Sequence, residues 1–278
     1  MSQRKLIYLK FRRNRLAVLG SGLLAFFVTC AIFADYLAPY DPLRADLANN
    51  LAPPSSEHIL GTDELGRDLL SRVIHGARIS LHLGVISVGT ALVFGVFIGA
   101  VAGYYGGAID QIVMRAVDIV LSFPTMLLAI MIVAVLGPGL TNAMIAVGIS
   151  LIPEYARLTR STFLYLRELD FVQAARMIGA SDPRVIFRHI LPNSLAPLIV
   201  QSTLNIATAI LSAAALGFLG LGAQPPLPEW GAMLSKGRVY LMVAPHVTLY
   251  PGLAIVVSVL SLNMIGDGLR DALDPRMT

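Results

Sequence analysis

IVLSFPTMLLAIMIVAVLGPGLTNAMIAVGISLIP, residues 119–153, is the stretch that decides the fold. It contains no Asp, Glu, Lys or Arg. A helix crosses the roughly 30 Å core of a bilayer in about 20 residues, so this stretch is too long for one span. Gly137-Pro138-Gly139 lies near its middle and is typical of a turn that ends a helix and reverses the chain. The stretch therefore predicts two membrane helices joined by a tight turn.

The composition agrees with a membrane location. The chain has 278 residues, of which 56% are hydrophobic and 14% are charged, and its mean hydropathy is +0.72. A soluble domain carries roughly 25% charged residues, so this chain lacks the polar surface that water requires. Its one cysteine, Cys30, lies inside an apolar run, which excludes an intramolecular disulfide and a cysteine-rich metal site.

Four further windows lack charged side chains: residues 16–34, 79–109, 190–228 and 239–266. Together with the two halves of residues 119–153, they predict six transmembrane helices. The third helix then begins near Gln111 and includes Arg115 and Asp118, and the fourth runs from about residue 140 to residue 157. The first window is longer than the apolar core of a signal peptide, about 7 to 15 residues, so we expect a retained anchor.

Basic residues predict the orientation, because Lys and Arg are enriched in cytoplasmic loops. With six helices and a cytoplasmic N-terminus, the basic N-terminal segment and the arginine-rich stretch 157–188 both lie inside. Of the 21 Lys and Arg residues, only Arg44, Arg67, Arg72, Arg78, Lys236 and Arg238 then lie outside. Five helices would place residues 157–188 outside, so we expect six helices with both termini in the cytoplasm.

The motifs of common enzymes are missing from the sequence. None of the three lysines is followed by Ser or Thr, so there is no Walker A phosphate loop, and neither H-E-x-x-H nor G-x-S-x-G occurs. His75 and His82 lack a third ligand, and we interpret them as hydrogen-bonded residues rather than as a metal site. We expect neither catalysis nor a cofactor on this chain.

Residues 166–197, LRELDFVQAARMIGASDPRVIFRHILPNSLAP, are polar enough to lie outside the bilayer and have the pattern of two short helices. Small and apolar residues recur at helical spacing up to Ile178, and Gly179 is placed to end that helix in a left-handed conformation. Asp182 is expected to be the N-cap of the second helix, which should break at Pro192. Two short, angled helices form a rigid prong, which suits docking to another protein.

Within this loop, Gln173-Ala174-Ala175, Gly179 and Ile190-Leu191-Pro192 resemble the EAA loop of ABC importer permeases, whose pattern is E-A-A, three residues, G, nine residues, I-x-L-P. Gln173 replaces the family glutamate, and His189 stands at the first isoleucine position. The resemblance implies that a coupling helix, residues 180–188, sits in a groove of a cytoplasmic ATPase subunit; an amphipathic interfacial hairpin is the alternative. The residues implied in ATPase coupling are Gln173, Ala174, Ala175, Gly179, Ala180, Ser181, Asp182, Arg184, Arg188, Leu191 and Pro192.

The resemblance extends along the chain. HILGTDELGRD at 58–68, GFLGLG at 217–222, EWG at 229–231 and GDGLRD at 266–271 look like regions of the dipeptide and oligopeptide permeases of the C type. This implies an all-α integral membrane protein with the type I ABC importer permease fold. Residues 1–78 would hold a cytoplasmic segment, the first transmembrane helix and a long extracytoplasmic loop. Residues 79–278 would form a five-helix permease core, with the ATPase-coupling loop at 166–192.

An importer of this family implies an extracytoplasmic binding protein, and the two long outside loops are the surfaces large enough to receive it. The docking candidates are Asp63, Glu64, Arg67, Asp68, Glu229 and Trp230. Trp230 is equally consistent with an anchor at headgroup depth. Leucine, valine and isoleucine side chains between residues 65 and 74 suit a short helix on the membrane surface, in which case this motif is scaffold.

Polar residues inside spans need partners or water, because a charge at the bilayer centre costs about 2.5 to 3.5 kcal/mol. Arg115 and Asp118 are spaced for an i, i+3 ion pair, as are Glu154 and Arg157, and we interpret both pairs as mainly structural. The candidates for the translocation path are Asp118, Gln201, Asn205 and Asn263. Glycines of the second span favour close helix packing: Gly84, Gly89, Gly95, Gly99 and Gly103.

The resemblance implies a permease subunit of an ATP-driven importer in the bacterial inner membrane. Its partners would be a homologous permease, two cytoplasmic ATPase subunits that hold ATP and Mg²⁺, the binding protein and membrane lipid, without nucleic acid. Dipeptides or oligopeptides are the expected substrates; nickel complexes, glutathione or another small solute are the alternatives. An ion-coupled secondary carrier is the rival class, but the two halves show no internal repeat, and the carboxylates near spans lie towards the inner ends.

Overall fold

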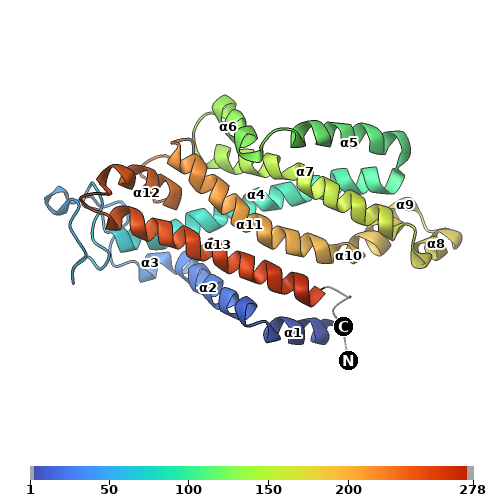
Figure 1. The fold of residues 1–278 in the computed structure, drawn as a ribbon, viewed down its shortest axis with the longest axis horizontal. Coiled ribbons are helices and arrows are strands. Elements are labelled where there is room, and N and C mark those ends of the chain that lie inside the picture. Colours follow the sequence, from blue (N-terminus) through green and yellow to red (C-terminus); the bar gives the residue numbers. More distant parts are fainter. Residues whose placement is uncertain (1–2, 274–278) are drawn as a thin grey trace.

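The computed structural model describes residues 3–273, which form an elongated bundle of helices (Figure 1). Within these residues the only β-type pairing is an isolated bridge between Thr62 and Asp68. The helices are α1 (Gln3–Arg13), α2 (Arg15–Ile32), α3 (Ala34–Leu37), η1 (Leu47–Asn49), α4 (Leu69–Tyr105), α5 (Gly107–Leu121), α6 (Thr125–Leu136), α7 (Leu140–Leu166), α8 (Asp170–Met177), α9 (Asp182–Arg184), η2 (Val185–Ile190), α10 (Leu191–Asn193), α11 (Leu195–Phe218), α12 (Trp230–Gly237), η3 (Arg238–Tyr240) and α13 (His246–Leu273).

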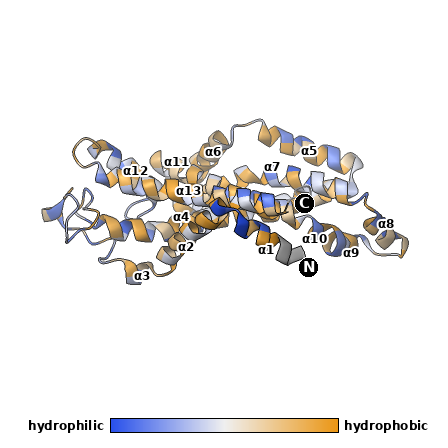
Figure 2. Cartoon of the chain, turned by 60° about the horizontal axis from the view of Figure 1, so that its bottom comes forward, coloured by the Kyte–Doolittle hydropathy of each residue, from blue (hydrophilic) through white to orange (hydrophobic). Residues whose placement is uncertain are grey.

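Four of these helices are long and apolar enough to cross a membrane: α2, α4, α11 and α13. The pair α5 and α6 makes a fifth span if it is counted as one, although the two helices are bent by 87°. Helix α7 is also long, but Glu154, Arg157 and Arg160 make its second half more polar. Figure 2 shows hydrophobic residues along much of the central helices, and hydrophilic residues in the loops at both ends and on α1 and α5. The prediction of an all-helical membrane protein is confirmed.

Residues 119–153 fold as two helices joined by a turn, as predicted, but the first helix has an additional break. Gly137 and Gly139 both have positive φ, 91° and 154°, between α6 and α7. The Asn142 amide donates to the carbonyls of Leu136 and Gly137, both at 2.9 Å, and so satisfies the end of α6. The predicted continuous third helix from Gln111 is interrupted before Pro124, where a proline ring is incompatible with an unbroken helix.

Helix α4 starts earlier than the window 79–109 indicated. Asp68 caps it by accepting a hydrogen bond from the backbone N–H of Ser71 at 2.8 Å, and Leu69 is fully buried. The expected short surface helix between residues 65 and 74 is therefore the first part of a 37-residue helix. Near the other end of the chain, α13 begins at His246, later than the window 239–266 indicated, so residues 239–245 lie before this helix.

The helices α4 and α7 pack closely along their length. A Cβ on Gly95 would lie 2.4 Å from the Cβ of Tyr155, and a Cβ on Gly99 would lie 2.3 Å from the carbonyl oxygen of Ala156. Gly89, by contrast, has open space around it. The expectation of close glycine packing is thus confirmed at Gly84, Gly95, Gly99 and Gly103 and not at Gly89. This contact joins the core formed by α4, α6, α7 and α11.

Candidate coupling prong, polar cluster and loop cluster

Residues 170–193, here called the prong, project from one end of the bundle (Figure 1). The helix α8 ends where the sequence predicts, because Gly179 has φ +82° and its N–H bonds to the carbonyl of Arg176 at 2.9 Å. A Cβ on Gly179 would meet no atom within 4 Å. Backbone conformation, rather than space, is therefore the reason for glycine at this position.

The second half of the prong differs from the prediction in two details. Ser181, not Asp182, is at the N-cap position of α9, without a side-chain capping hydrogen bond, and the Asp182 carboxylate accepts a hydrogen bond from the Tyr104 hydroxyl at 2.6 Å. The chain also does not break at Pro192. The π-helical turn η2 runs directly into α10, and Pro192 is the second residue of α10.

The prong is anchored to the ends of α4 and α7 by an apolar cluster. Val172, Val185 and Ile190 are fully buried, and they pack with Tyr104 and Phe163. The Arg176 guanidinium lies 5.1 Å from the centre of the Tyr104 ring. This packing joins the prong to the two helices as one body.

The opposite face of the prong is exposed and apolar. The side chains of Met177, Ile178 and Phe187 are 88%, 86% and 68% exposed. Arg184 and Arg188 are exposed beside them. Of the predicted coupling residues, only Ala175 is buried; Ala180 and Leu191 are half-buried, and the exposed ones are Gln173, Ala174, Gly179, Ser181, Asp182, Arg184, Arg188 and Pro192.

The predicted i, i+3 ion pairs, Arg115 with Asp118 and Glu154 with Arg157, do not form. Arg157 instead donates to Asp118 across α7 and α5 at 2.6 Å, and Arg160 donates to both carboxylate oxygens of Asp110. Helix α5 lies beside α7, so both guanidinium groups reach carboxylates on the neighbouring helix, and Arg160 binds Asp110 through two nitrogens. The interpretation of Asp118 with Arg115, and of Glu154 with Arg157, is therefore wrong.

Glu154 belongs to a polar cluster between α7 and α11. The Asn205 amide donates to Glu154 Oε2 at 3.3 Å, and the Gln201 amide donates to Asn205 Oδ1 at 3.1 Å. The Tyr155 hydroxyl donates to Ser202 Oγ at 3.1 Å nearby. The structure thus joins two of the predicted path residues, Gln201 and Asn205. Sequence reasoning missed Glu154 as their partner because the i, i+3 spacing of Glu154 and Arg157 indicated an ion pair between those two residues.

The other two path candidates lie apart from this cluster. Asp118 is on α5 and exposed, and Asn263 is half-buried on α13. A groove of about 510 Å³ lies beside the polar cluster, between α7, α11 and α13, and its walls include Leu158, Gln201 and Arg270. A second groove, of about 540 Å³ between α4, α5 and α7, has only apolar side chains in its walls.

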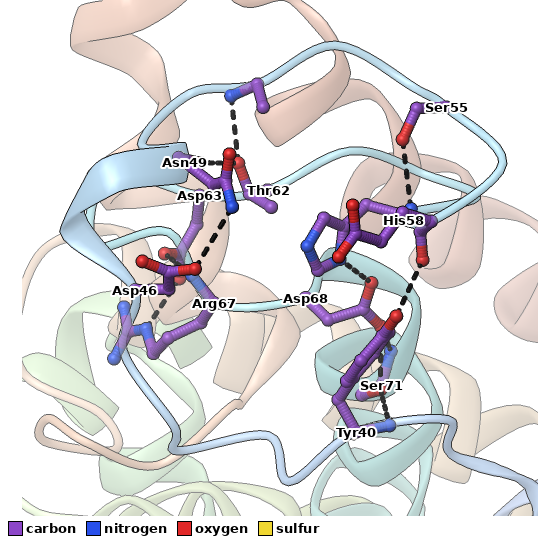
Figure 3. Close-up of polar contacts among 12 residues, drawn as sticks. Tyr40, Asp46, Asn49, Ser55, His58, Thr62, Asp63, Arg67, Asp68 and Ser71 are labelled. Atoms are coloured by element: carbon purple, nitrogen blue, oxygen red, sulfur yellow. Dashed lines mark hydrogen bonds and ion pairs between the residues drawn. The ribbon is translucent and has the colours of Figure 1, made fainter.

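Residues 58–72, here called the GTD cluster, form a network of buried charges (Figure 3). Arg67 binds Asp63 at 2.7 Å and Glu64 at 3.1 Å, and Arg72 Nε lies 3.2 Å from Asp63. Asp68 contacts His58 Nδ1 at 2.9 Å and accepts the Ser71 hydroxyl at 2.6 Å. These contacts tie the long loop after α3 to the start of α4.

The segment around α12 packs against the same end of the bundle. Glu229 caps α12 by accepting the N–H groups of Gly231 and Ala232, both at 2.8 Å, and burial raises the pKa of its carboxyl. The Trp230 indole is fully buried, donates to the carbonyl of Val73 at 3.0 Å and meets the Phe27 ring edge to face. Trp230 is therefore a core residue, and the interpretation as an anchor at headgroup depth is wrong.

Five of the six docking candidates are buried. The side chains of Asp63, Arg67, Asp68, Glu229 and Trp230 are buried, and Glu64 is half-buried. Their hydrogen bonds and ion pairs are made within this chain. They shape the loops of this end of the bundle, and their neighbours supply its exposed surface.

Comparisons with known proteins agree with this architecture. The family described as binding-protein-dependent transport system inner membrane component matches residues 95–278, and the N-terminal TM domain of oligopeptide transport permease C matches residues 2–54. The chain belongs to the first of these families. As an inner membrane component of a binding-protein-dependent transport system, it is an ABC transporter permease subunit and not an enzyme.

Related permeases match nearly the whole of this inner membrane component. It is 52% identical to the dipeptide transport system permease protein DppC of Alkalihalophilus pseudofirmus, over 96% of this chain and 88% of the relative. It is 50% identical to the di/tripeptide transport system permease protein DppC of Pseudomonas aeruginosa, over 96% and 90%. It is 46% identical to the glutathione transport system permease protein GsiD of Pectobacterium atrosepticum, over 96% and 89%.

A solved structure has the same fold. A chain of the MetNI methionine ABC transporter in an inward-facing conformation superimposes with a TM-score of 0.59, over 74% of this chain and 98% of that chain. Sequence identity is 20%, so the similarity concerns the fold alone. The expected type I ABC permease fold is confirmed.

Proposed function

We propose that this chain is the permease subunit of an ATP-driven importer for dipeptides or oligopeptides, and that it forms the translocation path with a second, homologous permease. The observation that carries the proposal is the prong, an exposed apolar surface anchored to α4 and α7, in a chain that is about half identical to dipeptide permeases. Glutathione is the second candidate substrate, because GsiD is nearly as similar.

The proposal includes six spans with both termini in the cytoplasm. In this arrangement, α2, α4, the bent pair α5 and α6, α7, α11 and α13 are the six spans, and residues 1–78 and 79–278 are the two parts of the chain. Support comes from the two arginine pairs that neutralise carboxylates beside the polar half of α7. Such pairing lowers the cost of charges near the membrane.

In the cytoplasm, the prong would dock on an ATPase subunit, with ATP and Mg²⁺ held by two such subunits. Met177, Ile178 and Phe187 form an exposed apolar patch, and patches of this kind mark sites of protein interaction. Arg184 and Arg188 add charges that suit acidic groups on the partner. Because the prong packs on α4 and α7, movement of the ATPases would be transmitted to these helices.

On the outside, a binding protein would deliver the substrate to the end of the bundle that carries the GTD cluster. The buried ion pairs of Asp63, Arg67 and Asp68 support a scaffold role, in which they hold the receiving loops in shape. For the path, Gln201 and Asn205 are supported by their position beside the groove between α7, α11 and α13. Asp118 and Asn263 remain further candidates.

The first experiment is to solubilise native membranes in mild detergent, capture this chain by a C-terminal tag, and identify the co-purifying proteins by mass spectrometry. We expect a second permease and two ATPase subunits, and ATP-dependent uptake of a labelled dipeptide after reconstitution with the binding protein. Recovery of the chain alone across several detergents, with uptake activity of its own, would contradict the proposal and favour an ion-coupled carrier.

A further inference from the structure

Glu154 stands out among the carboxylates near the proposed spans. Asp110 and Asp118 each bind an arginine, whereas Glu154 has no Lys, Arg or His nitrogen within 4 Å among the described residues. Its only polar partner there is the neutral amide of Asn205. A half-buried carboxylate in a membrane helix is costly without a cation, so its partner is expected to come from another molecule.

A cation without an ion pair among the described residues lines the groove between α7, α11 and α13. Arg270 of α13 contributes to the groove wall, and it too makes no ion pair within residues 3–273. Gln201 lines the groove and binds Asn205, which binds Glu154. Leu158, another wall residue, is one turn after Glu154 on α7. The groove wall therefore carries the Gln201 amide and the Arg270 guanidinium, and Glu154 lies beside the wall, linked to Gln201 through Asn205.

Helix packing gives the offset of Glu154 and Arg270 along the axis of α11. Helix α13 runs antiparallel to α11, since Leu262 packs near Ile210 and Gly266 packs on Leu204. One turn further, Arg270 lies at the level of Val200, while Glu154 lies at the level of Asn205. Five residues of α11 cover about 7.5 Å along its axis. Two extended peptide residues cover at most about 7 Å.

We propose that this groove and the polar cluster beside it hold a short peptide during its passage, with the peptide α-ammonium on Glu154 and the peptide carboxylate on Arg270. Asn205 and Gln201 supply neutral hydrogen bonds beside the ammonium. This inference rests on the proposed function, and it names the chemical feature that the path recognises: two free, oppositely charged ends. Dipeptides, tripeptides and glutathione all carry a free α-ammonium and a free carboxylate, so one groove suits each of them.

The test uses the complete importer, reconstituted in vesicles with its second permease, ATPases and binding protein, and labelled alanyl-alanine as the probe. The variants are Glu154→Gln and Arg270→Gln, with Glu154→Asp as the variant that keeps the charge. Asp267→Asn on α13 is the matched control, because it removes an exposed carboxylate one turn from Arg270 that does not line the groove. Uptake turnover, KM and binding-protein-stimulated ATP hydrolysis are measured together.

We expect Glu154→Gln and Arg270→Gln to lower uptake turnover by about 10- to 100-fold, the effect of losing one hydrogen bond to a charged group. KM should change little because the binding protein captures the substrate, and ATP hydrolysis should continue, so more ATP is used for each peptide. Glu154→Asp should retain most of the uptake. The control should transport as the wild type does.

Three results would overturn the inference. One is normal uptake per ATP in Glu154→Gln. Another is a parallel loss of uptake and ATP hydrolysis with normal yield, which would indicate a general structural role. The third is a loss of the second permease from purified Glu154→Gln, which would assign the missing cation to that subunit. Failure of the wild-type complex to take up alanyl-alanine with ATP would instead count against the proposed function.

Discussion

Individual glycines decide how closely the helices of this permease approach one another. Gly95 and Gly99 lie where α4 touches the backbone or Cβ atoms of α7, and no side chain fits between them. Gly89 lies on the same helix, and a methyl group added there would meet nothing within 4 Å. Identical residues in one helix thus differ in structural importance, and only the neighbouring helix distinguishes them.

Replacement of Gly99 by alanine is expected to destabilise the fold. The new Cβ would lie 2.3 Å from the carbonyl oxygen of Ala156, and overpacking of this kind costs about 1 to 3 kcal/mol. Gly89→Ala is the matched control, and we expect it to be neutral or slightly stabilising. Thermal unfolding of the two variants in detergent measures the difference. Equal melting temperatures would show that α4 and α7 are not packed as described.

At the scale of elements, the prong illustrates how a short segment becomes rigid without a large core. Val172, Val185 and Ile190 bury one face against Tyr104 and Phe163, and Gly179 reverses the chain between α8 and α9. The exposed face keeps Met177, Ile178 and Phe187 available to a partner. Geometry at Gly179 therefore sets the angle between α8 and α9.

Gly179→Ala tests whether this angle matters for coupling. A side chain at φ +82° is strained by about 1 to 2 kcal/mol, although space is open there, so the turn should rearrange. We expect uptake and substrate-stimulated ATP hydrolysis to fall while protein levels stay normal. Gly107→Ala is the control, because Gly107 also has positive φ and open space but lies outside the prong. If uptake and stimulated hydrolysis both survive in Gly179→Ala, the coupling assignment is wrong.

At the scale of the whole molecule, the number of spans depends on α7. If α7 crosses the membrane, the prong lies in the cytoplasm and the segment before α13 lies outside. If it does not, both segments change sides. Met177 on the prong and Met242 before α13 are 88% and 94% exposed, so each can report the side on which it lies.

Cysteine labelling measures this directly, since Cys30 is the only cysteine and can be replaced by alanine. Single-cysteine variants Met177→Cys and Met242→Cys are treated in intact spheroplasts with a membrane-impermeant maleimide. Six spans with a cytoplasmic N-terminus predict labelling of Met242→Cys alone. Labelling of Met177→Cys alone would support five spans, in which α7 does not cross the membrane. Both variants should react after the membrane is permeabilised.

The sequence by itself determined the all-helical membrane class, the turn at Gly137 and Gly139, the end of α8 at Gly179 and the family motifs. These properties depend on local composition and backbone preference, which neighbouring residues along the chain carry. Only the tertiary structure decided which charges meet. Arg157 pairs with Asp118 rather than with Glu154, and Trp230 is a core residue, because helices distant in sequence lie side by side. Spacing along one helix contains no information about the helix packed against it.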